Sequence, residues 1–155
     1  RLNADLFISI HADSVGNDVA RGGSVYSLSS RGSSEAAARI AERENDADTI
    51  NGVALSDTSD AVSAILVDLS QRETQAQSLD MARLYLREVK GQMRSHYDTP
   101  QSAAFIVLKA PDVPSVLIEL GYMSSPKDAE LLNSEGWRTQ AAAAVQQAVD
   151  HYFER

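Results

Sequence analysis

Leu6-Phe7-Ile8-Ser9-Ile10 is a short, apolar and β-rich run that ends at His11. A continuous run of this kind is typical of a strand that is buried on both faces, as in a mostly parallel sheet. A second run, Ser115-Val116-Leu117-Ile118, is followed directly by Glu119. Because ligands bind at the carboxyl ends of strands in open α/β sheets, we expect His11 and Glu119 to lie in one pocket.

A histidine and a glutamate in such a pocket suit a metal-assisted hydrolysis. Neutral imidazole is a good ligand for Zn²⁺, and a neighbouring carboxylate can take a proton from metal-bound water. Burial would raise the pKa of the glutamate toward the range useful for this role. The alternative is structural: His11 is a hydrogen-bonded histidine at a strand end, and Glu119 pairs with an arginine. The residues alone leave both interpretations open.

The rest of the chain alternates between strand and helix signals. Residues 44–61 are polar and acidic with a glycine, and predict a surface loop or irregular helix. The expected strands and helices together predict an α/β fold, with a mostly parallel or mixed sheet flanked by helices. Further strands are expected at 24–28 and 104–108, and helices from Ser33 or Ser34, through the periodic segment 62–93 (as one helix or two), from Ser125 and over 135–153.

Length and composition favour one globular domain spanning residues 1–155. The chain has 43% apolar and 23% charged residues and a net charge of −8, which argues against nucleic acid or an anionic membrane surface as a partner. No apolar run approaches the roughly 18 residues of a membrane span. The sequence contains no cysteine, so disulfides and thiolate metal sites are excluded.

Other candidate chemistry is weaker. The chain has neither the Gly-x-Ser-x-Gly nucleophile motif nor a phosphate-binding Gly-x-x-x-x-Gly-Lys loop. The remaining histidines, His96 and His151, are predicted to be surface residues in helical surroundings. The acidic residues between 42 and 48 fit a Ca²⁺ loop by composition, but they lack the glycine and terminal glutamate of an EF-hand loop. A solvated acidic segment is therefore favoured there.

Three segments resemble motifs of the zinc-dependent N-acetylmuramoyl-L-alanine amidases, which cleave peptidoglycan. Ser9-Ile10-His11-Ala12-Asp13 is similar to the family's S-I-H-A-[ND] segment. Residues 105–115 resemble its F-x-V-L-K-x-P-x-x-P-S stretch, and residues 116–125 resemble E-x-[GA]-F-[IL]-[ST]-N. The three occur in the family's order and spacing, so the resemblance covers nearly the whole chain.

The resemblance implies a periplasmic, exported enzyme that acts on peptidoglycan during daughter-cell separation and wall remodelling. The bond cleaved would be the amide between the lactyl group of N-acetylmuramic acid and the L-alanine of the stem peptide. By the same resemblance, His11 is a ligand of the Zn²⁺ cofactor and Glu119 is the catalytic acid/base.

The chain departs from the family pattern in its metal ligands. Two further zinc ligands of the family, a histidine and a glutamate, precede the S-I-H-A segment, whereas the ten residues before His11 contain neither. We therefore expect an N-terminally incomplete domain, in keeping with its start at Arg1, that binds zinc weakly or not at all. Ser125 also replaces the family's asparagine. The alternatives are a non-catalytic peptidoglycan-binding or protein-interaction fragment of the amidase fold, and a different metal hydrolase.

Residues from about 43 to 80 resemble the regulatory insertion of cell-division amidases. In that subgroup a helix covers the active site, and one of its glutamates occupies the zinc until an activator of the LytM-domain type withdraws the helix. Glu44 is the candidate blocking residue and Glu42 the second choice; the alternative for both is a solvated acid. Three apolar residues of the insertion are candidates for the activator-docking patch, or else part of the core: Ile65, Leu66 and Leu69.

Overall fold

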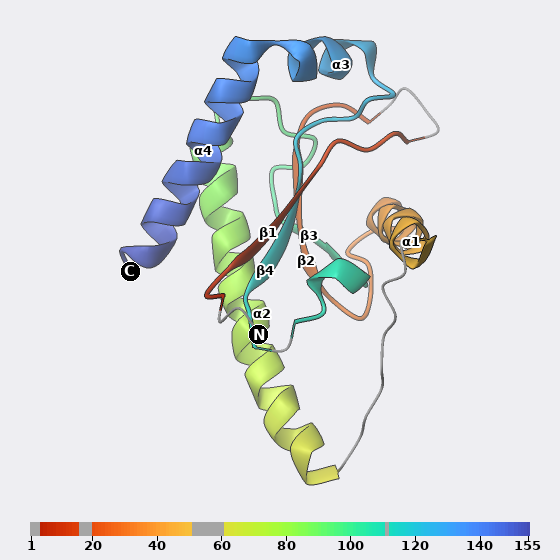
Figure 1. Ribbon diagram of the computed structural model, residues 1–155, viewed down its shortest axis with the longest axis vertical. Helices are drawn as coiled ribbons and strands as arrows, with labels where there is room; N and C mark the ends of the chain where they lie inside the picture. The colour runs from red at the N-terminus through yellow and green to blue at the C-terminus, as the bar shows by residue number, and fades with distance from the viewer. Residues whose placement is uncertain (1–3, 16–19, 51–60, 111) are drawn as a thin grey trace.

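The computed structural model describes residues 4–15, 20–50, 61–110 and 112–155; within its helices, the side chains of residues 48–50 and 61–71 are not described. This part of the chain contains both strands and helices (Figure 1). In chain order they are β1 (Phe7–His11), β2 (Ser24–Leu28), α1 (Glu35–Ile50), α2 (Ala61–Val89), β3 (Gln101–Ala103), the 3₁₀ helix η1 (Ile106–Leu108), β4 (Ser115–Glu119), α3 (Pro126–Asn133) and α4 (Glu135–Phe153).

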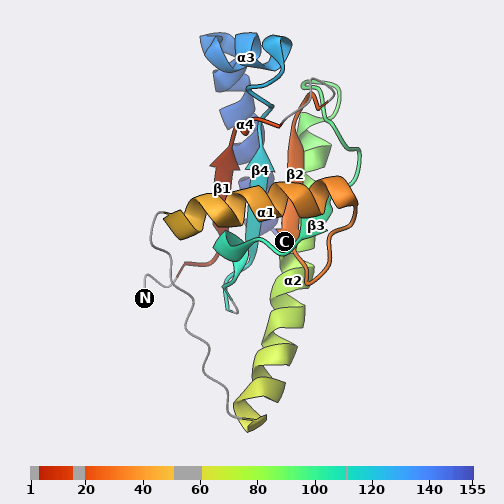
Figure 2. The ribbon, with the colours of Figure 1, turned by 90° about the vertical axis from the view of Figure 1, so that its right-hand side faces the viewer.

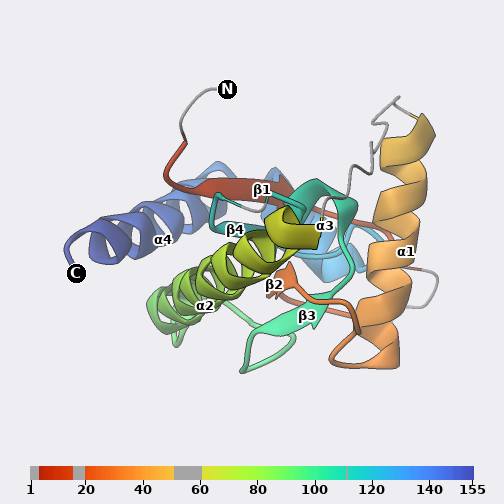
Figure 3. The ribbon, with the colours of Figure 1, turned by 90° about the horizontal axis from the view of Figure 1, so that it is seen from below.

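The described strands form one mixed sheet in the order β1-β4-β2-β3. β1 pairs in parallel with β4, β4 pairs antiparallel with β2, and β2 pairs in parallel with β3. Helices lie on both faces of this sheet (Figure 3). The predicted α/β class and the mixed sheet flanked by helices are therefore confirmed.

Alternation along β4 separates the two faces of the sheet. Val116 and Ile118 belong to a core with residues of α2 and α4, whereas Leu117 belongs to a second core with α1 and η1. Because side chains alternate along a strand, Glu119 points to the same face as Leu117. α1 crosses this second face of the sheet (Figure 2), so Glu119 and α1 lie on one side of the molecule.

The predicted strand at 104–108 is wrong. β3 ends at Ala103, and residues 106–108 form η1. Phe105 and Leu108 are 0% and 1% exposed and lie in the same core. A strand would point these two side chains to opposite faces, whereas 3₁₀ geometry places residues three apart on one face. Burial of the Phe105 ring and of the Leu108 methyl groups on the α1 side therefore favours the 3₁₀ turn.

The acidic stretch is also more regular than predicted, because residues 44–50 continue α1 as an ordinary helix. The Ser34 hydroxyl accepts a hydrogen bond from the Ala37 amide at 3.1 Å, as expected of a helix cap. The periodic segment forms a single helix, α2, which ends at Val89. The expectation that β1 is buried on both faces is wrong: Phe7 and Ile10 are 38% and 55% exposed, since the described residues pair β1 on one side alone.

The two C-terminal helices begin where the sequence predicts. Ser125 caps α3, with Pro126 in its first turn, and Ser134 caps α4. Small residues (Ala141, Ala144 and Ala148) form the buried face of α4, and Ala144 and Ala148 share a core with residues of α2. Among the described residues, no helix is both long and apolar enough to cross a membrane.

Candidate active site

The pairing of β1 with β4 brings His11 and Glu119 together. The two strands run parallel, and His11 is the register partner of Glu119 at the carboxyl ends of both. Paired residues of neighbouring strands point to the same face, so the imidazole and the carboxylate both face α1. The structure therefore places these two predicted site residues in one location, although 107 residues of chain separate them.

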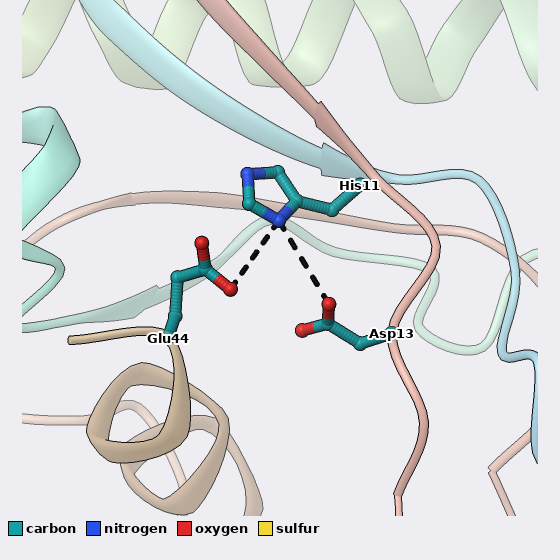
Figure 4. Close-up of side chains that lie close together, drawn as sticks. All are labelled: His11, Asp13 and Glu44. Atoms are coloured by element: carbon teal, nitrogen blue, oxygen red, sulfur yellow. Dashed lines mark ion pairs between the residues drawn. The ribbon is translucent and has the colours of Figure 1, made fainter. Parts of the chain in front are cut away.

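His11 lies between a hydroxyl and two carboxylates. Its Nε2 is 2.7 Å from the Ser9 hydroxyl, while its Nδ1 is 3.4 Å from Oε2 of Glu44 and 3.8 Å from Oδ1 of Asp13 (Figure 4). Each of the three residues offers one ligand atom within 4.8 Å of the others. We refer to them as the His11–Asp13–Glu44 group. Since Zn²⁺ accepts imidazole nitrogen and carboxylate oxygen, these donors fit this metal.

Glu119 is completely buried beside this group. Its Oε2 accepts a hydrogen bond from the Asp13 amide at 3.1 Å, and its Oε1 has no hydrogen-bond partner within the described part of the chain. Removal from water, followed by the nearby charges of Asp13 and Glu44, raises the pKa of Glu119 to about 9. The alternative in which Glu119 pairs with an arginine is wrong, because no such ion pair occurs among the described residues.

The site is rich in negative charge. A hydrogen bond with His11 lowers the pKa of Asp13 below its ordinary value, so Asp13 holds a negative charge while Glu119 retains a proton. Glu44 contributes a third carboxyl group, at the same imidazole nitrogen as Asp13. The carboxyl groups of Asp13 and Glu44 beside one imidazole, with a third carboxyl group buried nearby, favour binding of a cation.

A buried carboxylate on α3 supports the loops around Glu119. Oδ2 of Asp128 accepts hydrogen bonds from the backbone amides of Gly22, at 2.8 Å, and Tyr122, at 3.0 Å. Its Oδ1 lies 3.6 Å from Nε of Arg21. Asp128 therefore ties the entrance of β2 to the loop that follows Glu119. Gly22 has a φ of 90° and its Cα lies against the Arg94 carbonyl, where a Cβ would approach to 2.7 Å.

Tyr122 fills the space behind this loop. It is fully buried, and its hydroxyl is 3.3 Å from both the Ser24 hydroxyl and the Tyr26 hydroxyl. The His96 ring packs edge-on against Tyr122, with ring centroids 5.9 Å apart. The prediction that His96 lies in a helix at the surface is therefore wrong: it is partly buried in the loop after α2, because its amide donates to the Gly23 carbonyl.

The other candidates from the sequence lie apart from this site or outside the described side chains. Glu42 and Asp46 are exposed on α1, as the solvated interpretation predicts, and the helical backbone there excludes a Ca²⁺ loop. His151 lies on α4 with its Nδ1 3.1 Å from Glu88. Three predicted docking residues lie in the backbone of α2, but their side chains are not among those described: Ile65, Leu66 and Leu69.

A family model described as N-acetylmuramoyl-L-alanine amidase matches residues 1–151 of this chain. The chain belongs to this family. It is 40% identical over 151 residues to the N-acetylmuramoyl-L-alanine amidase AmiA of Escherichia coli K12, an alignment that covers 97% of this chain and 52% of AmiA. It is 37% identical to AmiC of Neisseria meningitidis, with 97% of this chain and 36% of AmiC covered. The chain thus spans about half the length of AmiA and less of AmiC.

Solved amidase structures share the fold. The CwlD amidase of Clostridioides difficile, solved in complex with the GerS lipoprotein, superposes with a TM-score of 0.60 at 18% identity, covering 99% of this chain and 57% of CwlD. The amidase AmiC2 of Nostoc punctiforme gives a TM-score of 0.58 at 21% identity, covering 99% of this chain and 60% of AmiC2. These similarities support the amidase architecture of the mixed sheet and its helices.

The prediction from the sequence did not identify three residues at or near the site: Asp13, Asn45 and Asp128. Asp13 stands inside the S-I-H-A-[ND] segment, two residues after His11, so its place in the motif was a usable signal. Asn45 stands in the segment that resembles the regulatory insertion, but neither its position nor that of Asp128 indicates which groups it contacts. Asn45 acts through backbone groups about sixty residues away, and Asp128 through amides on two separate loops.

Replacement of Asp128 by alanine tests its role in supporting the site. The change leaves two buried backbone amides without an acceptor and Arg21 without its partner, so we expect Asp128→Ala to lower the free energy of unfolding by about 2–5 kcal/mol. Asp128→Asn keeps an acceptor oxygen and should lose less. Urea titration of both variants measures this. A loss below about 0.5 kcal/mol, the range of ordinary surface substitutions, for Asp128→Ala would contradict the role.

Proposed function

We propose that this amidase domain hydrolyses the bond between N-acetylmuramic acid and the L-alanine of the stem peptide in peptidoglycan. The observation that carries the proposal is the buried Glu119, whose unpartnered Oε1 lies beside the His11–Asp13–Glu44 group. Relatives named N-acetylmuramoyl-L-alanine amidases, at up to 40% identity, support it. The biological role is daughter-cell separation and wall remodelling, and because the substrate lies outside the cytoplasmic membrane, the protein is exported to the periplasm.

The reaction requires a water to attack the lactyl carbonyl and the L-alanine amine to leave. Bound Zn²⁺ supplies a Lewis acid that polarises the carbonyl and the water. His11 is the ligand that the S-I-H-A motif assigns, and Asp13 and Glu44 offer carboxylates beside it. The Ser9 hydroxyl at Nε2 fixes the imidazole so that Nδ1 faces those carboxylates.

Glu119 moves the proton in this proposal. With a cation bound at the neighbouring His11–Asp13–Glu44 group, the pKa of Glu119 would be lower and its carboxylate would be ionised. Oε1 would then take a proton from the attacking water and deliver it to the leaving amine, so one carboxyl group serves as base and then as acid. Burial suits the residue to the second half of this task, because a raised pKa makes the carboxyl group retain the proton until the amine takes it. The Asp13 amide holds Oε2 and thereby leaves Oε1 as the reacting oxygen.

Glu44 blocks the site in the resting state. Its carboxylate lies 3.4 Å from Nδ1 of His11. There it would occupy the open coordination position that water and substrate need on a bound metal. Residues from about 43 to 80 form the regulatory insertion in this proposal, and a partner of the LytM-domain type would withdraw it. Ile65, Leu66 and Leu69 remain candidates for the docking patch, with core packing as the alternative.

The donor set points to an incomplete zinc site in residues 1–155. A catalytic zinc site takes three protein ligands and an open position, and here one histidine is joined by Asp13 and by the blocking Glu44. We infer that residues 1–155 form a single catalytic domain that lacks two of its ligands. This shortage is also the observation that favours the second candidate, a non-catalytic peptidoglycan-binding or protein-interaction fragment.

Metal analysis of the purified 155-residue chain tests the ligand set. We expect well under one zinc per molecule after dialysis, and a further fall in zinc affinity of about 10-fold or more in His11→Ala, because an imidazole ligand is lost. Inductively coupled plasma measurement and zinc titration give these values. Stoichiometric, tightly held zinc would contradict the incomplete site, while turnover of peptidoglycan upon addition of zinc would exclude the non-catalytic alternative.

Glu119→Gln in the full-length protein tests the catalytic role. The amide cannot accept the proton from water, so we expect release of stem peptides from purified peptidoglycan to fall about 10²–10⁴-fold. The zinc content should be unchanged. Glu130→Gln, an exposed glutamate on α3, serves as the matched control and should keep its activity. Wild-type turnover by Glu119→Gln would exclude the proposed acid/base.

Glu44→Gln in the full-length protein tests the block. Loss of the carboxylate weakens the contact with His11, so we expect basal release of dye-labelled peptidoglycan, without activator, to rise by roughly an order of magnitude. Glu42→Gln on the same helix is the control, since this exposed side chain lies outside the His11–Asp13–Glu44 group. An increase with Glu42→Gln and none with Glu44→Gln would reverse the assignment.

A further inference from the structure

We propose that Asn45 is the positioning residue that holds Glu44 at His11, and that its release from the β3–η1 segment is a step of activation. The proposal rests on the blocking role of Glu44 proposed above. It concerns two hydrogen bonds: Nδ2 of Asn45 donates to the Ala104 carbonyl at 2.8 Å, and Oδ1 accepts from the Ile106 amide at 2.7 Å. We call this pair of bonds the Asn45 clamp.

The two backbone groups that Asn45 bonds lie between β3 and η1, where the hydrogen-bond pattern of the strand has ended. β3 ends at Ala103, and η1 begins at Ile106, so the carbonyl of Ala104 and the amide of Ile106 lie between the two elements. An asparagine side chain has a donor and an acceptor at the spacing needed to bond both groups. An aspartate can only accept, and an alanine can do neither. The clamp therefore depends on the residue type at position 45.

The remaining attachment of α1 is modest. Among the side chains of α1 that the structure describes, those in the apolar core are Ala37, Ile40 and Ala41, and two of these three are alanines, which bury little area. A second polar contact, from Nη1 of Arg43 to the Ser14 carbonyl, is long at 3.4 Å and exposed. The clamp thus adds two short polar contacts, at 2.8 and 2.7 Å, in the half of α1 that carries Glu44. Because Asn45 directly follows Glu44, a shift of the helix at one residue moves the other.

The clamp is accessible from solvent. Asn45 and Ala104 line an open surface pocket of about 390 Å³ together with Ala41, Glu42 and Asp46. Water or a hydrogen-bond donor on a partner can therefore reach the Ala104 carbonyl without disturbing the core around α2 and α4. A contact that is formed in the resting state and can be exchanged at the surface is suited to regulation.

Asn45→Ala in the full-length protein, with Asp46→Ala as the matched control, tests the clamp. Two lost hydrogen bonds correspond to a rise of roughly 5- to 30-fold in the open population of α1. We expect amide hydrogen exchange over residues 38–47 and basal peptidoglycan release to rise by this factor. Alanine favours helix more than asparagine does, so faster exchange cannot come from helix propensity. Asp46→Ala should change neither value, and thermal unfolding checks that both variants fold.

Two further variants separate the clamp from the block. Asn45→Asp keeps the acceptor for Ile106 alone and should give an intermediate effect. Glu44→Gln/Asn45→Ala should release no more peptidoglycan than Glu44→Gln, because the clamp acts through Glu44. Unchanged exchange and activity in Asn45→Ala, with activation by Glu44→Gln, would overturn the clamp and leave the block standing. Faster exchange in Asn45→Ala without activation by Glu44→Gln would overturn the block, and with it the regulatory role of Asn45.

Discussion

The parallel pairing of β1 with β4 is the constraint on which the site depends. In this register His11 lies beside Glu119, and a slip by one residue would turn one of the two side chains to the opposite face of the sheet. The same alternation sends Val116 and Ile118 into the core with α2 and α4. Apolar residues on one face therefore fix the register, and the register in turn brings the polar residues together on the other face.

Burial of the Glu119 carboxyl group lowers the stability of the folded state, and neighbouring contacts must offset this loss. Glu119 is fully buried with one oxygen unpartnered, and a group of this kind is ordinarily unfavourable. Asp128 compensates in part, because it satisfies two loop amides on either side of the site. Glu119, with one oxygen unpartnered, and Asp128, which accepts two backbone hydrogen bonds, lie nine positions apart in the chain.

Much of the fold was predictable from the sequence because strand ends and helix caps are local signals. Ser34, Ser125 and Ser134 cap the helices they precede, and the placement of His11 and Glu119 follows from two apolar runs. The turn at Phe105 and Leu108 was not predictable, since a short apolar run fits a strand as well as a 3₁₀ turn. Nor was the contact of Asn45, which bonds backbone groups 59 and 61 residues away.

The apolar core on the α1 face is shared among several elements of the fold. This core contains Tyr26, Phe105 and Leu117. The rings of Tyr26 and Phe105 pack with their centroids 5.3 Å apart, so this core does not depend on α1 alone. Of the described side chains of α1, three belong to this core: Ala37, Ile40 and Ala41. Movement of α1 away from the sheet therefore exposes limited apolar area, and each Å² of it costs about 25 cal/mol of free energy. The core between the sheet, α2 and α4 does not include α1. In the block proposed for Glu44, the polar contacts near this residue therefore matter for holding α1, because the described apolar contacts of the helix are few.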